Sequence, residues 1–191
     1  MKPDKQITEI VESLYDIGTV TAVNEIFGGY KSRSFGIETL KDGCAHTYFL
    51  RKYKVGMSAG EIRFEHALIN HAIKNGFAIA AGIVASAGGE TFVQPANSRS
   101  IFAIFEYLDG EDRYTWNNPD LTDAEFNSAG RVLAIFHNAV HDFNPGGLQR
   151  VEPPILAFWP RLAGKFAGFA RPKNAGKWQA YYASHLPGLL D

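Results

Sequence analysis

The order of secondary-structure patterns along the chain constrains its fold more than any other sequence feature. Strand-like runs gather in the first 108 residues, over 20–27, 32–40, 46–54 and 100–108 with two short runs beside Gly88-Gly89. The clearest later pattern is a helical one over residues 122–141. A repeating βαβ chain would alternate strands and helices to its end. The order therefore predicts an α+β fold, with a sheet-rich lobe followed by a helical lobe.

Two amphipathic helices are predicted within the sheet-rich lobe. The first covers residues 4–15, with its apolar side chains on one side and Gly18 as its end. The second begins with a capping box of Ser58 and Glu61 and ends before Gly76. A tight hairpin turn is predicted at Asp42-Gly43, before the third strand.

Composition excludes several classes of protein. The 191 residues carry a formal net charge of −1, which argues against nucleic acid as the main partner because phosphate binding demands a basic surface. The single Cys44 excludes an internal disulfide framework and a multi-cysteine zinc site. No stretch approaches the roughly 20 apolar residues needed to span a bilayer, and the first residues lack the apolar segment of a signal peptide. We therefore expect a cytoplasmic protein without a membrane span.

Arg51 in the third strand is a cation on a face that we expect to be covered. Alternation along the strand places Arg51 between Phe49 and Tyr53 on one face. The following helix offers an anionic partner, because Glu65 lies within its apolar stripe. Buried charges need partners, so an Arg51–Glu65 ion pair is predicted. The alternatives are that Glu65 lies at the edge of the stripe and reaches water, or that Glu61 is the partner, although Glu61 suits the capping box better.

Two further segments each allow a structural and a functional interpretation. Gly28-Gly29 between the first two strands is either a simple hairpin turn or a loop whose backbone N–H groups approach a phosphate. The run over residues 104–111 is either an edge strand with a solvated loop or a hinge whose backbone binds a flat heterocycle.

Taken together, these motifs resemble a known family. The chain contains, in order, a Gly-Gly hairpin, a Tyr-Phe-Leu-Arg strand, a Phe-Glu-His-Ala-Leu-Ile helix, a Phe-Glu-Tyr-Leu-Asp-Gly segment and an Ala-Gly-Arg-Val-Leu-Ala-Ile-Phe-His helix. This order is similar to that of the aminoglycoside phosphotransferase and choline/homoserine kinase superfamily, over roughly residues 18–143. The resemblance implies a protein-kinase-like fold, with an N-terminal lobe of residues 1–108 and the start of a helical C-terminal lobe at 109–191. It also implies an ATP-dependent phosphotransferase acting on a small hydroxylated metabolite.

The resemblance carries functional roles to residues of this sequence. It implies that Gly28 and Gly29 cover the phosphates of ATP, that Arg51 holds the α- and β-phosphates, and that Glu65 orients Arg51. It likewise implies that the backbone of Glu106, Tyr107 and Leu108 binds adenine. His137 corresponds to a structural position at the end of a helix of the family.

Phosphoryl transfer also needs groups that the sequence does not supply. It needs a carboxylate to accept the substrate proton and ligands for Mg²⁺, which the family provides in a His-Gly-Asp-x-x-x-x-Asn loop and a later Asp motif. After Asp142 the only carboxylate side chains are Glu152 and Asp191. Asp142 itself is either a poor imitation of that loop or part of a helix end and turn, and the latter is favoured. We therefore name no catalytic residue and no metal ligand, and expect the chain to stop before the catalytic loop.

Two charged regions also remain open to alternative interpretations. The acidic residues either attract a cationic substrate or lie in a solvated loop and at a helix N-terminus, which is favoured. They are Asp109, Glu111, Asp112, Asp120 and Asp123. A basic amphipathic helix over residues 158–169 either lies on a membrane or partner or, as favoured, packs inside the helical lobe. If part of that lobe is lacking, its exposed surface would promote self-association.

Two functions are consistent with these observations. The first is the nucleotide-binding portion of an ATP-dependent small-molecule kinase, which uses ATP and Mg²⁺. The second is a non-catalytic nucleotide-binding or interaction module. The lack of catalytic carboxylates favours the second for this polypeptide, while the first describes its family better.

Overall fold

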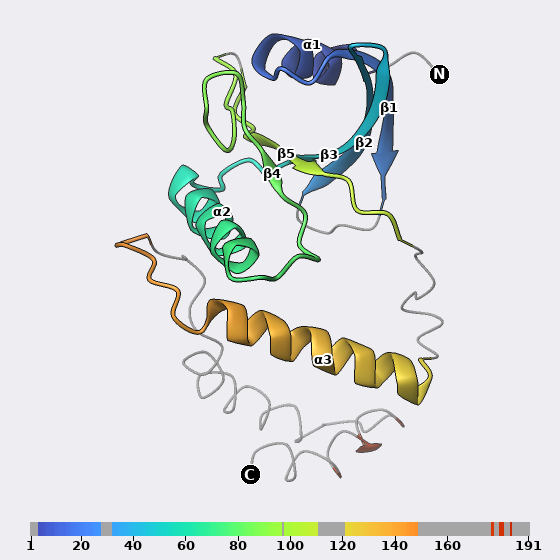
Figure 1. Ribbon diagram of the computed structural model, residues 1–191, viewed down its shortest axis with the longest axis vertical. Coiled ribbons are helices and arrows are strands. Elements are labelled where there is room, and N and C mark those ends of the chain that lie inside the picture. The colour runs from blue at the N-terminus through green and yellow to red at the C-terminus, as the bar shows by residue number, and fades with distance from the viewer. Residues whose placement is uncertain are drawn as a thin grey trace. The chain divides into compact units, whose positions relative to one another are not determined.

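The computed structural model describes residues 4–27, 32–96, 98–110 and 121–148, together with residues 177, 180, 181 and 184. The chain divides into two compact units, residues 1–149 and 150–191. The first unit holds the sheet and the three helices discussed here (Figure 1). The boundary between lobes at residues 108 and 109 stays a prediction.

One antiparallel sheet contains the five described strands, in the order β1-β2-β3-β5-β4. The strands are β1 (Thr19–Ile26), β2 (Arg33–Lys41), β3 (Cys44–Lys52), β4 (Ile83–Val84) and β5 (Phe102–Glu106). Asp42 and Gly43 join β2 to β3, and their φ angles of 52° and 79° are those of a tight hairpin turn. The predicted hairpin is therefore confirmed.

Among the described residues of the first unit, three helices accompany the sheet, each with a side-chain cap at its N-terminus. They are α1 (Lys5–Leu14), α2 (Ala59–Lys74) and α3 (Asp123–Val140). The predicted capping box of Ser58 and Glu61 opens α2, and Thr122 with Glu125 forms a second one at α3. These caps satisfy backbone N–H groups that have no partner within the helix.

Two local predictions differ from the structure. Helix α1 ends at Leu14 rather than at Gly18. Gly18 has a φ of +95° and lies so close to the Leu40 carbonyl that a Cβ atom would overlap it, so this glycine permits a close backbone approach instead. The two short strands predicted beside Gly88-Gly89 reduce to β4, which precedes them, and a single bridge between Val93 and Phe102.

The sheet has a core on each face. Alternate residues of β5 point to opposite faces, and all residues from Phe102 to Phe105 are buried. Phe102 and Ile104 join a cluster that includes Ile7 of α1, whereas Ala103 and Phe105 join a cluster that includes Ile62 of α2. We call these sides the α1 face and the α2 face. Because β5 lies between β3 and β4, it is an interior strand, and the edge-strand interpretation of this run is wrong.

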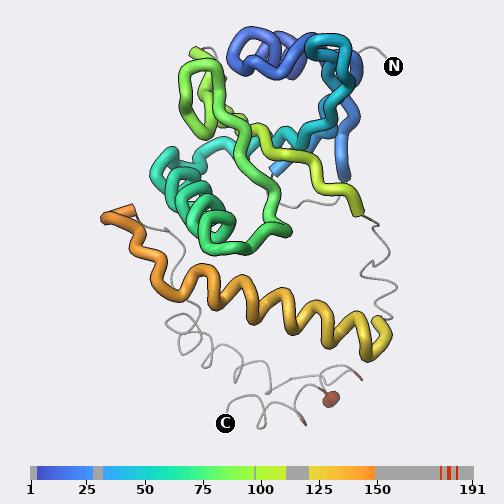
Figure 2. Tube along the Cα trace, viewed as in Figure 1, coloured from blue at the N-terminus to red at the C-terminus, as the bar shows by residue number. Residues whose placement is uncertain are grey.

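The C-terminal end of α3 lies beside the end of α2 (Figure 2). Phe77 and Phe136 meet edge to face with ring centroids 5.3 Å apart. The Asn75 side chain donates a hydrogen bond to the Ala139 carbonyl at 2.9 Å. These contacts attach α3 to the C-terminal end of α2. Within the described parts of the chain, no helix is long and apolar enough to cross a membrane.

Candidate functional site

Arg51 extends from β3 onto the α2 face, as alternation along the strand predicts. Its guanidinium carbon lies 5.9 Å from the ring centre of Phe49, 5.8 Å from that of Tyr53 and 5.4 Å from that of Phe105. Aromatic rings at these distances attract a cation. The Arg51 side chain is 35% exposed, so the guanidinium lies against the aromatic surface while still reaching solvent.

Glu65 of α2 is the anionic partner of Arg51. Arg51 Nη1 donates to Glu65 Oε1 at 2.6 Å, and the Glu65 side chain is 31% exposed. Glu61 accepts from the Ser58 backbone at 3.0 Å, as its place in the capping box requires. The predicted Arg51–Glu65 pair is thus confirmed, and the alternative in which Glu61 is the partner is wrong. Glu65 also reaches solvent, as the other alternative held. A guanidinium carries five N–H donors, so the bond to Glu65 leaves most of its donor capacity for an anionic ligand.

Tyr53 and His66 form a buried polar pair beside this ion pair. Tyr53 Oη and His66 Nε2 are 3.0 Å apart, and each residue is 2% exposed. Burial, and then the positive charge of Arg51, lower the pKa of His66 to about 4. Burial, and then the negative charge of Glu65, raise the pKa of Tyr53 well above its usual value. Both side chains are therefore neutral at neutral pH.

His66 was not predicted from the sequence as a site residue. A usable signal is present, because Ile62, His66 and Ile69 follow one another at the i, i+4, i+7 spacing of a buried helix face. His66 therefore belongs to the same apolar stripe that drew attention to Glu65.

The predicted hinge follows directly from β5, the neighbour of β3. Arg51 pairs with Ala103, and Glu106 lies three residues further along β5, about 10 Å away at the usual rise per residue. The Glu106 carboxylate accepts a hydrogen bond from the Gly82 N–H at 3.2 Å, and the Glu106 N–H donates to the Gly82 carbonyl at 2.8 Å. Tyr107 and Leu108 are exposed. A role of Glu106 in binding a ligand therefore falls to its backbone carbonyl rather than to its side chain.

Gly28 and Gly29 lie outside the described residues. The strands that flank them are braced, because Arg33 bonds Glu25 through two parallel hydrogen bonds of 2.7 and 2.8 Å. The hydrogen bonds from Arg33 lower the pKa of the Glu25 carboxyl below its usual value. Phe27, next to the glycines, is 86% exposed. The phosphate-loop role of Gly28 and Gly29 stays a prediction.

Asp142 belongs to a polar joint between α2 and α3. Its carboxylate lies 2.8 Å from His71 Nε2 and accepts a bond from the Asn75 side chain at 3.4 Å. The hydrogen bond from His71 lowers the pKa of Asp142. Phe143 packs its ring 5.3 Å from that of His71. This arrangement agrees with the interpretation of Asp142 as part of a helix end and turn.

The other charged residues singled out in the sequence are only partly described. Asp109 is exposed, and Asp123 lies in the first turn of α3, where negative charge is favourable. His137 lies in the last turn of α3. Glu111, Asp112 and Asp120, and the predicted basic helix over residues 158–169, lie outside the described residues. Among the described residues, no group of three His, Cys, Asp or Glu side chains could hold a metal ion.

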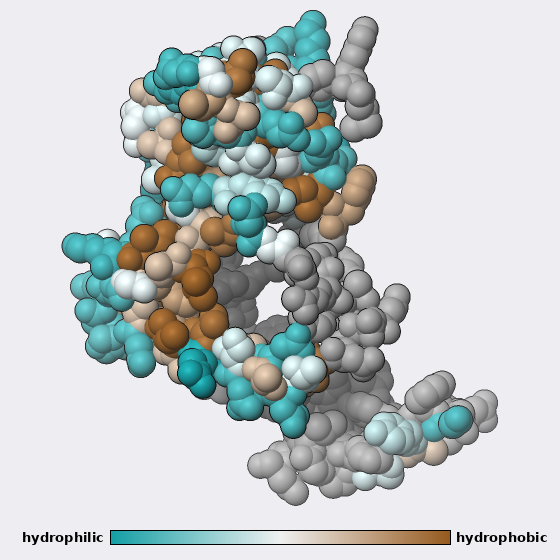
Figure 3. Space-filling model, turned by 45° about the vertical axis from the view of Figure 1, so that its right-hand side comes forward, coloured by the Kyte–Doolittle hydropathy of each residue, from teal (hydrophilic) through white to brown (hydrophobic). Residues whose placement is uncertain are grey.

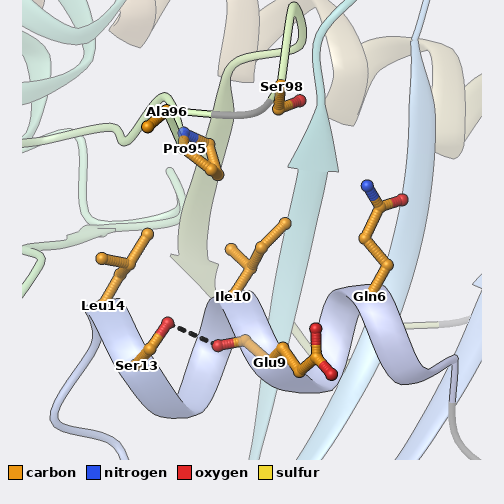
Figure 4. A pocket seen from close by; sticks show the side chains of 8 residues that line it. All are labelled: Gln6, Glu9, Ile10, Ser13, Leu14, Pro95, Ala96 and Ser98. Atoms are coloured by element: carbon orange, nitrogen blue, oxygen red, sulfur yellow. Dashed lines mark hydrogen bonds between the residues drawn. The ribbon is translucent and has the colours of Figure 1, made fainter.

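A pocket of about 360 Å³ lies elsewhere, between α1 and the segment over residues 95–98 (Figure 4). Gln6, Glu9 and Ile10 line it from the helix, and Pro95 and Ser98 line it from the segment. Because α1 covers the face opposite Arg51, this pocket is separate from the Arg51–Glu65 pair. The surface of the unit also carries exposed apolar side chains (Figure 3). Tyr107 and Leu108 of the predicted hinge are among the exposed residues.

Solved structures with a similar fold include phosphotransferases and a kinase. A spectinomycin phosphotransferase in complex with ADP and spectinomycin has a TM-score of 0.63 and 16% identity, covering 96% of this chain and 54% of its own. A microcompartment-associated aminopropanol kinase has a TM-score of 0.61 and 19% identity, covering 88% of this chain and 49% of its own. An aminoglycoside phosphotransferase from Alicyclobacillus acidocaldarius has a TM-score of 0.60 and 16% identity, and the match covers 93% of this chain and 48% of that protein.

These likenesses establish a kinase-like α+β fold, as the sequence predicts. The chain spans about half the length of the solved structures that it matches. No curated protein matches the sequence. A family model of phosphotransferase enzymes, however, matches residues 22–188. The chain therefore belongs to the phosphotransferase enzyme family.

Proposed function

We propose that this chain is the ATP-binding portion of a kinase that phosphorylates a small hydroxylated molecule. The observation that carries the proposal is the 2.6 Å ion pair between Arg51 of β3 and Glu65 of α2, beside the strand that leads into the hinge. Membership of the phosphotransferase family supports the reaction class. Similar folds in an aminopropanol kinase and in a spectinomycin phosphotransferase support amino alcohols and aminoglycosides as substrates to test.

Each site residue has a distinct role in this proposal. Arg51 holds the α- and β-phosphates, because charge-assisted hydrogen bonds from a guanidinium match phosphate oxygens well. Glu65 keeps the guanidinium in place by binding one edge of it. The Gly28-Gly29 loop covers the phosphates with backbone N–H groups. The backbone from Glu106 to Leu108 binds adenine, while the Glu106 side chain holds Gly82.

The described residues do not fit a magnesium site. Mg²⁺ takes oxygen ligands from carboxylates and from the phosphates of the nucleotide, and no suitable cluster of acidic side chains is present among the described residues. We therefore derive no catalytic step through the metal. The proposal for this chain concerns nucleotide binding and the orientation of the phosphates.

Titration of the 191-residue chain with ATP, with and without Mg²⁺, tests the proposal. Binding is expected, and Arg51→Ala should weaken it by about 1–3 kcal/mol, the range for a hydrogen bond to a charged group. Lys52→Ala is the matched control, because it removes an equal charge from the next residue, whose ammonium lies 5.6 Å from the Phe102 ring on the α1 face. No binding at millimolar ATP, or equal affinity in the Arg51→Ala chain, would contradict the assignment.

A second candidate function is a non-catalytic nucleotide-binding or interaction module. It is favoured by the contacts of Asp142, whose carboxylate serves the joint with His71 and Asn75. The two candidates differ in phosphate transfer to a panel of amino alcohols and aminoglycosides. The module binds ATP without transfer, and the kinase transfers phosphate. Transfer that Asp142→Asn abolishes would make Asp142 catalytic and overturn its interpretation as a structural residue.

A further inference from the structure

Glu106 is the last residue of β5 and the first residue of the predicted hinge. Its backbone N–H donates to the Gly82 carbonyl at 2.8 Å. Extending the antiparallel register of Ile83 with Phe105 by one residue pairs Gly82 with Glu106. Residues that face each other in such a ladder exchange either two hydrogen bonds or none. Because the first bond is present, a regular ladder would add a second one, from the Gly82 N–H to the Glu106 carbonyl.

The Glu106 side chain takes the place of this second bond. The Gly82 N–H donates instead to Glu106 Oε2 at 3.2 Å. Within the part of the chain that the structure describes, these two are the only hydrogen bonds between Gly82 and Glu106. The pair of Val93 and Phe102 shows the regular arrangement, in which each N–H donates to the carbonyl of the other residue at 2.8 Å. The Glu106 carbonyl therefore lacks the partner that the ladder would give it.

Gly82 leaves room for the Glu106 carboxylate. A Cβ atom at position 82 would lie 2.6 Å from Glu106 Oε2 and 2.8 Å from Glu106 Cδ. These atoms belong to the end of a flexible side chain of an exposed residue, so a methyl group at position 82 would displace the carboxylate and leave the backbone in place. The contact therefore requires both an acceptor at the end of the Glu106 side chain and the lack of a side chain at Gly82.

A carbonyl without a ladder partner can accept a hydrogen bond from a ligand. In a strand the N–H and C=O of one residue point to the same side, so the Glu106 carbonyl faces the β4 side of β5, where the hinge begins. Adenine carries an amino group that donates, whereas guanine carries a keto oxygen at the corresponding position. A free carbonyl pairs with the first group and leaves the second unpaired, which costs free energy in a binding site.

We propose that the side chain of Glu106 makes it a positioning residue, which gives the hinge a preference for adenine over guanine by keeping the Gly82 N–H away from the Glu106 carbonyl. The inference rests on the proposed function, in which the hinge backbone binds the base. The carboxylate acts through Gly82 and does not itself bind the nucleotide. Without it, the Gly82 N–H completes the ladder and competes with the base for the carbonyl.

The first experiment compares the affinities of the 191-residue chain for ATP and GTP. Glu106→Ala removes the carboxylate and should lower the ratio of ATP affinity to GTP affinity about three- to tenfold, the equivalent of one hydrogen bond between neutral groups. Glu106→Gln keeps an acceptor oxygen at the end of the side chain and should hold the ratio within about twofold. An unchanged ratio in Glu106→Ala, or an equal loss in both variants, would overturn the inference.

Substitution of Gly82 tests the same contact from its other partner. Gly82→Ala displaces the carboxylate without removing it, so it should lower the ratio as much as Glu106→Ala does. The two substitutions together should have no larger effect than either alone, because they break one interaction. Gly130→Ala is the matched control, since a Cβ atom there meets no neighbouring atom, and it should leave the ratio unchanged. Fully additive effects of Gly82→Ala and Glu106→Ala would overturn the inference.

Thermal unfolding separates positioning from stability. Because Glu106 is exposed, the unfolding midpoints of Glu106→Ala and Gly82→Ala should stay close to that of the unmodified chain. A lower midpoint with an unchanged ratio of ATP to GTP affinity would mean that the contact serves only stability and would overturn the inference.

Proton NMR of the Gly82 amide tests the hydrogen bond without a nucleotide. Its signal should move as the pH is lowered through the titration of the carboxyl groups, and should stay fixed in Glu106→Gln, whose acceptor does not titrate. The Val93 amide donates to a backbone carbonyl and should stay fixed in both chains. A fixed Gly82 signal in the unmodified chain would overturn the inference.

The nucleotide titrations also distinguish failure of the inference from failure of the proposed function. Absence of ATP binding by the unmodified chain would overturn the proposed function and, with it, the positioning role. ATP binding by the unmodified chain with the same ratio of ATP to GTP affinity in Glu106→Ala would overturn the positioning role alone.

Discussion

The two faces of the sheet are built from the same strands but from different kinds of side chain. On the α1 face, Leu50 and Ile104 pack into a cluster made of apolar residues. On the α2 face, the neighbouring residue Arg51 is paired with Glu65. His66, the residue after Glu65, is buried. Alternation along one strand thus separates a stabilising surface from a candidate binding surface by a single residue.

The charged groups can lie near a hydrophobic core because they are paired with one another. The α1 face buries apolar area, which is the main stabilising contribution to a fold. The α2 face carries charge and a buried imidazole, which are costly unless they are paired. We expect substitutions of buried residues on either face to change stability, and substitutions of the charged pair on the α2 face to change ligand binding.

The largest expected effect is the loss of stability in Leu50→Ala. Leu50 has no exposed surface, and truncation of such a side chain costs about 2–5 kcal/mol through lost burial and the cavity left behind. Urea unfolding measures the change. Protein that remains folded should bind ATP normally. A loss below about 1 kcal/mol would contradict the assignment of this face to stability.

The second effect is a pH dependence that originates on the α2 face. The folded-state pKa of His66 is about 4, below the usual value of 6.5, so between these values the unfolded chain binds a proton that the folded chain does not. Stability is therefore fully present above about pH 6.5 and falls as the pH is lowered to about 4, by on the order of 3 kcal/mol.

Urea unfolding at several pH values between 4 and 7 measures this dependence. His66→Gln, which does not titrate, removes the contribution of the imidazole while the ordinary carboxyl groups titrate in both chains. An identical pH dependence in the unmodified and His66→Gln chains would show that His66 is not held neutral by burial.

The third effect separates binding from stability within α2. Glu65→Gln should change the free energy of unfolding by less than about 1 kcal/mol, because both partners of the ion pair reach solvent. ATP affinity should nevertheless fall, since Arg51 loses its charged partner. Glu61→Gln is the control, because glutamine also serves a capping box, and it should leave ATP affinity unchanged. Equal ATP affinities in Glu65→Gln and Glu61→Gln would contradict the role of the Arg51–Glu65 pair in ligand binding.

The smallest effect is expected at the joint between α2 and α3. Asp142→Asn weakens an exposed contact with His71, so it should lower the thermal unfolding midpoint only slightly and leave ATP affinity within twofold. Asp109→Asn, at an exposed position outside the joint, is the control and should leave the midpoint unchanged. A large loss of ATP affinity in Asp142→Asn would extend the binding surface to this joint.

Local rules account for the parts of the fold and of the site that were predictable. The Ser58–Glu61 box and the Asp42-Gly43 turn depend on residues close in sequence, and both form. The Arg51–Glu65 pair was also predictable, because strand alternation and a helical stripe each left one charge needing a partner. His66 was not identified, although its spacing from Ile62 is that of a buried helix position.

The sequence by itself determined the order of strands and helices, the helix caps and the faces on which Arg51 and Glu65 lie. Only the tertiary structure decided that β5 lies between β3 and β4, that the Glu106 side chain binds Gly82, and that His66 meets Tyr53. Caps and alternation follow from backbone geometry over a few residues. The other contacts join residues 13 or more positions apart, so they depend on how the helices pack on the sheet.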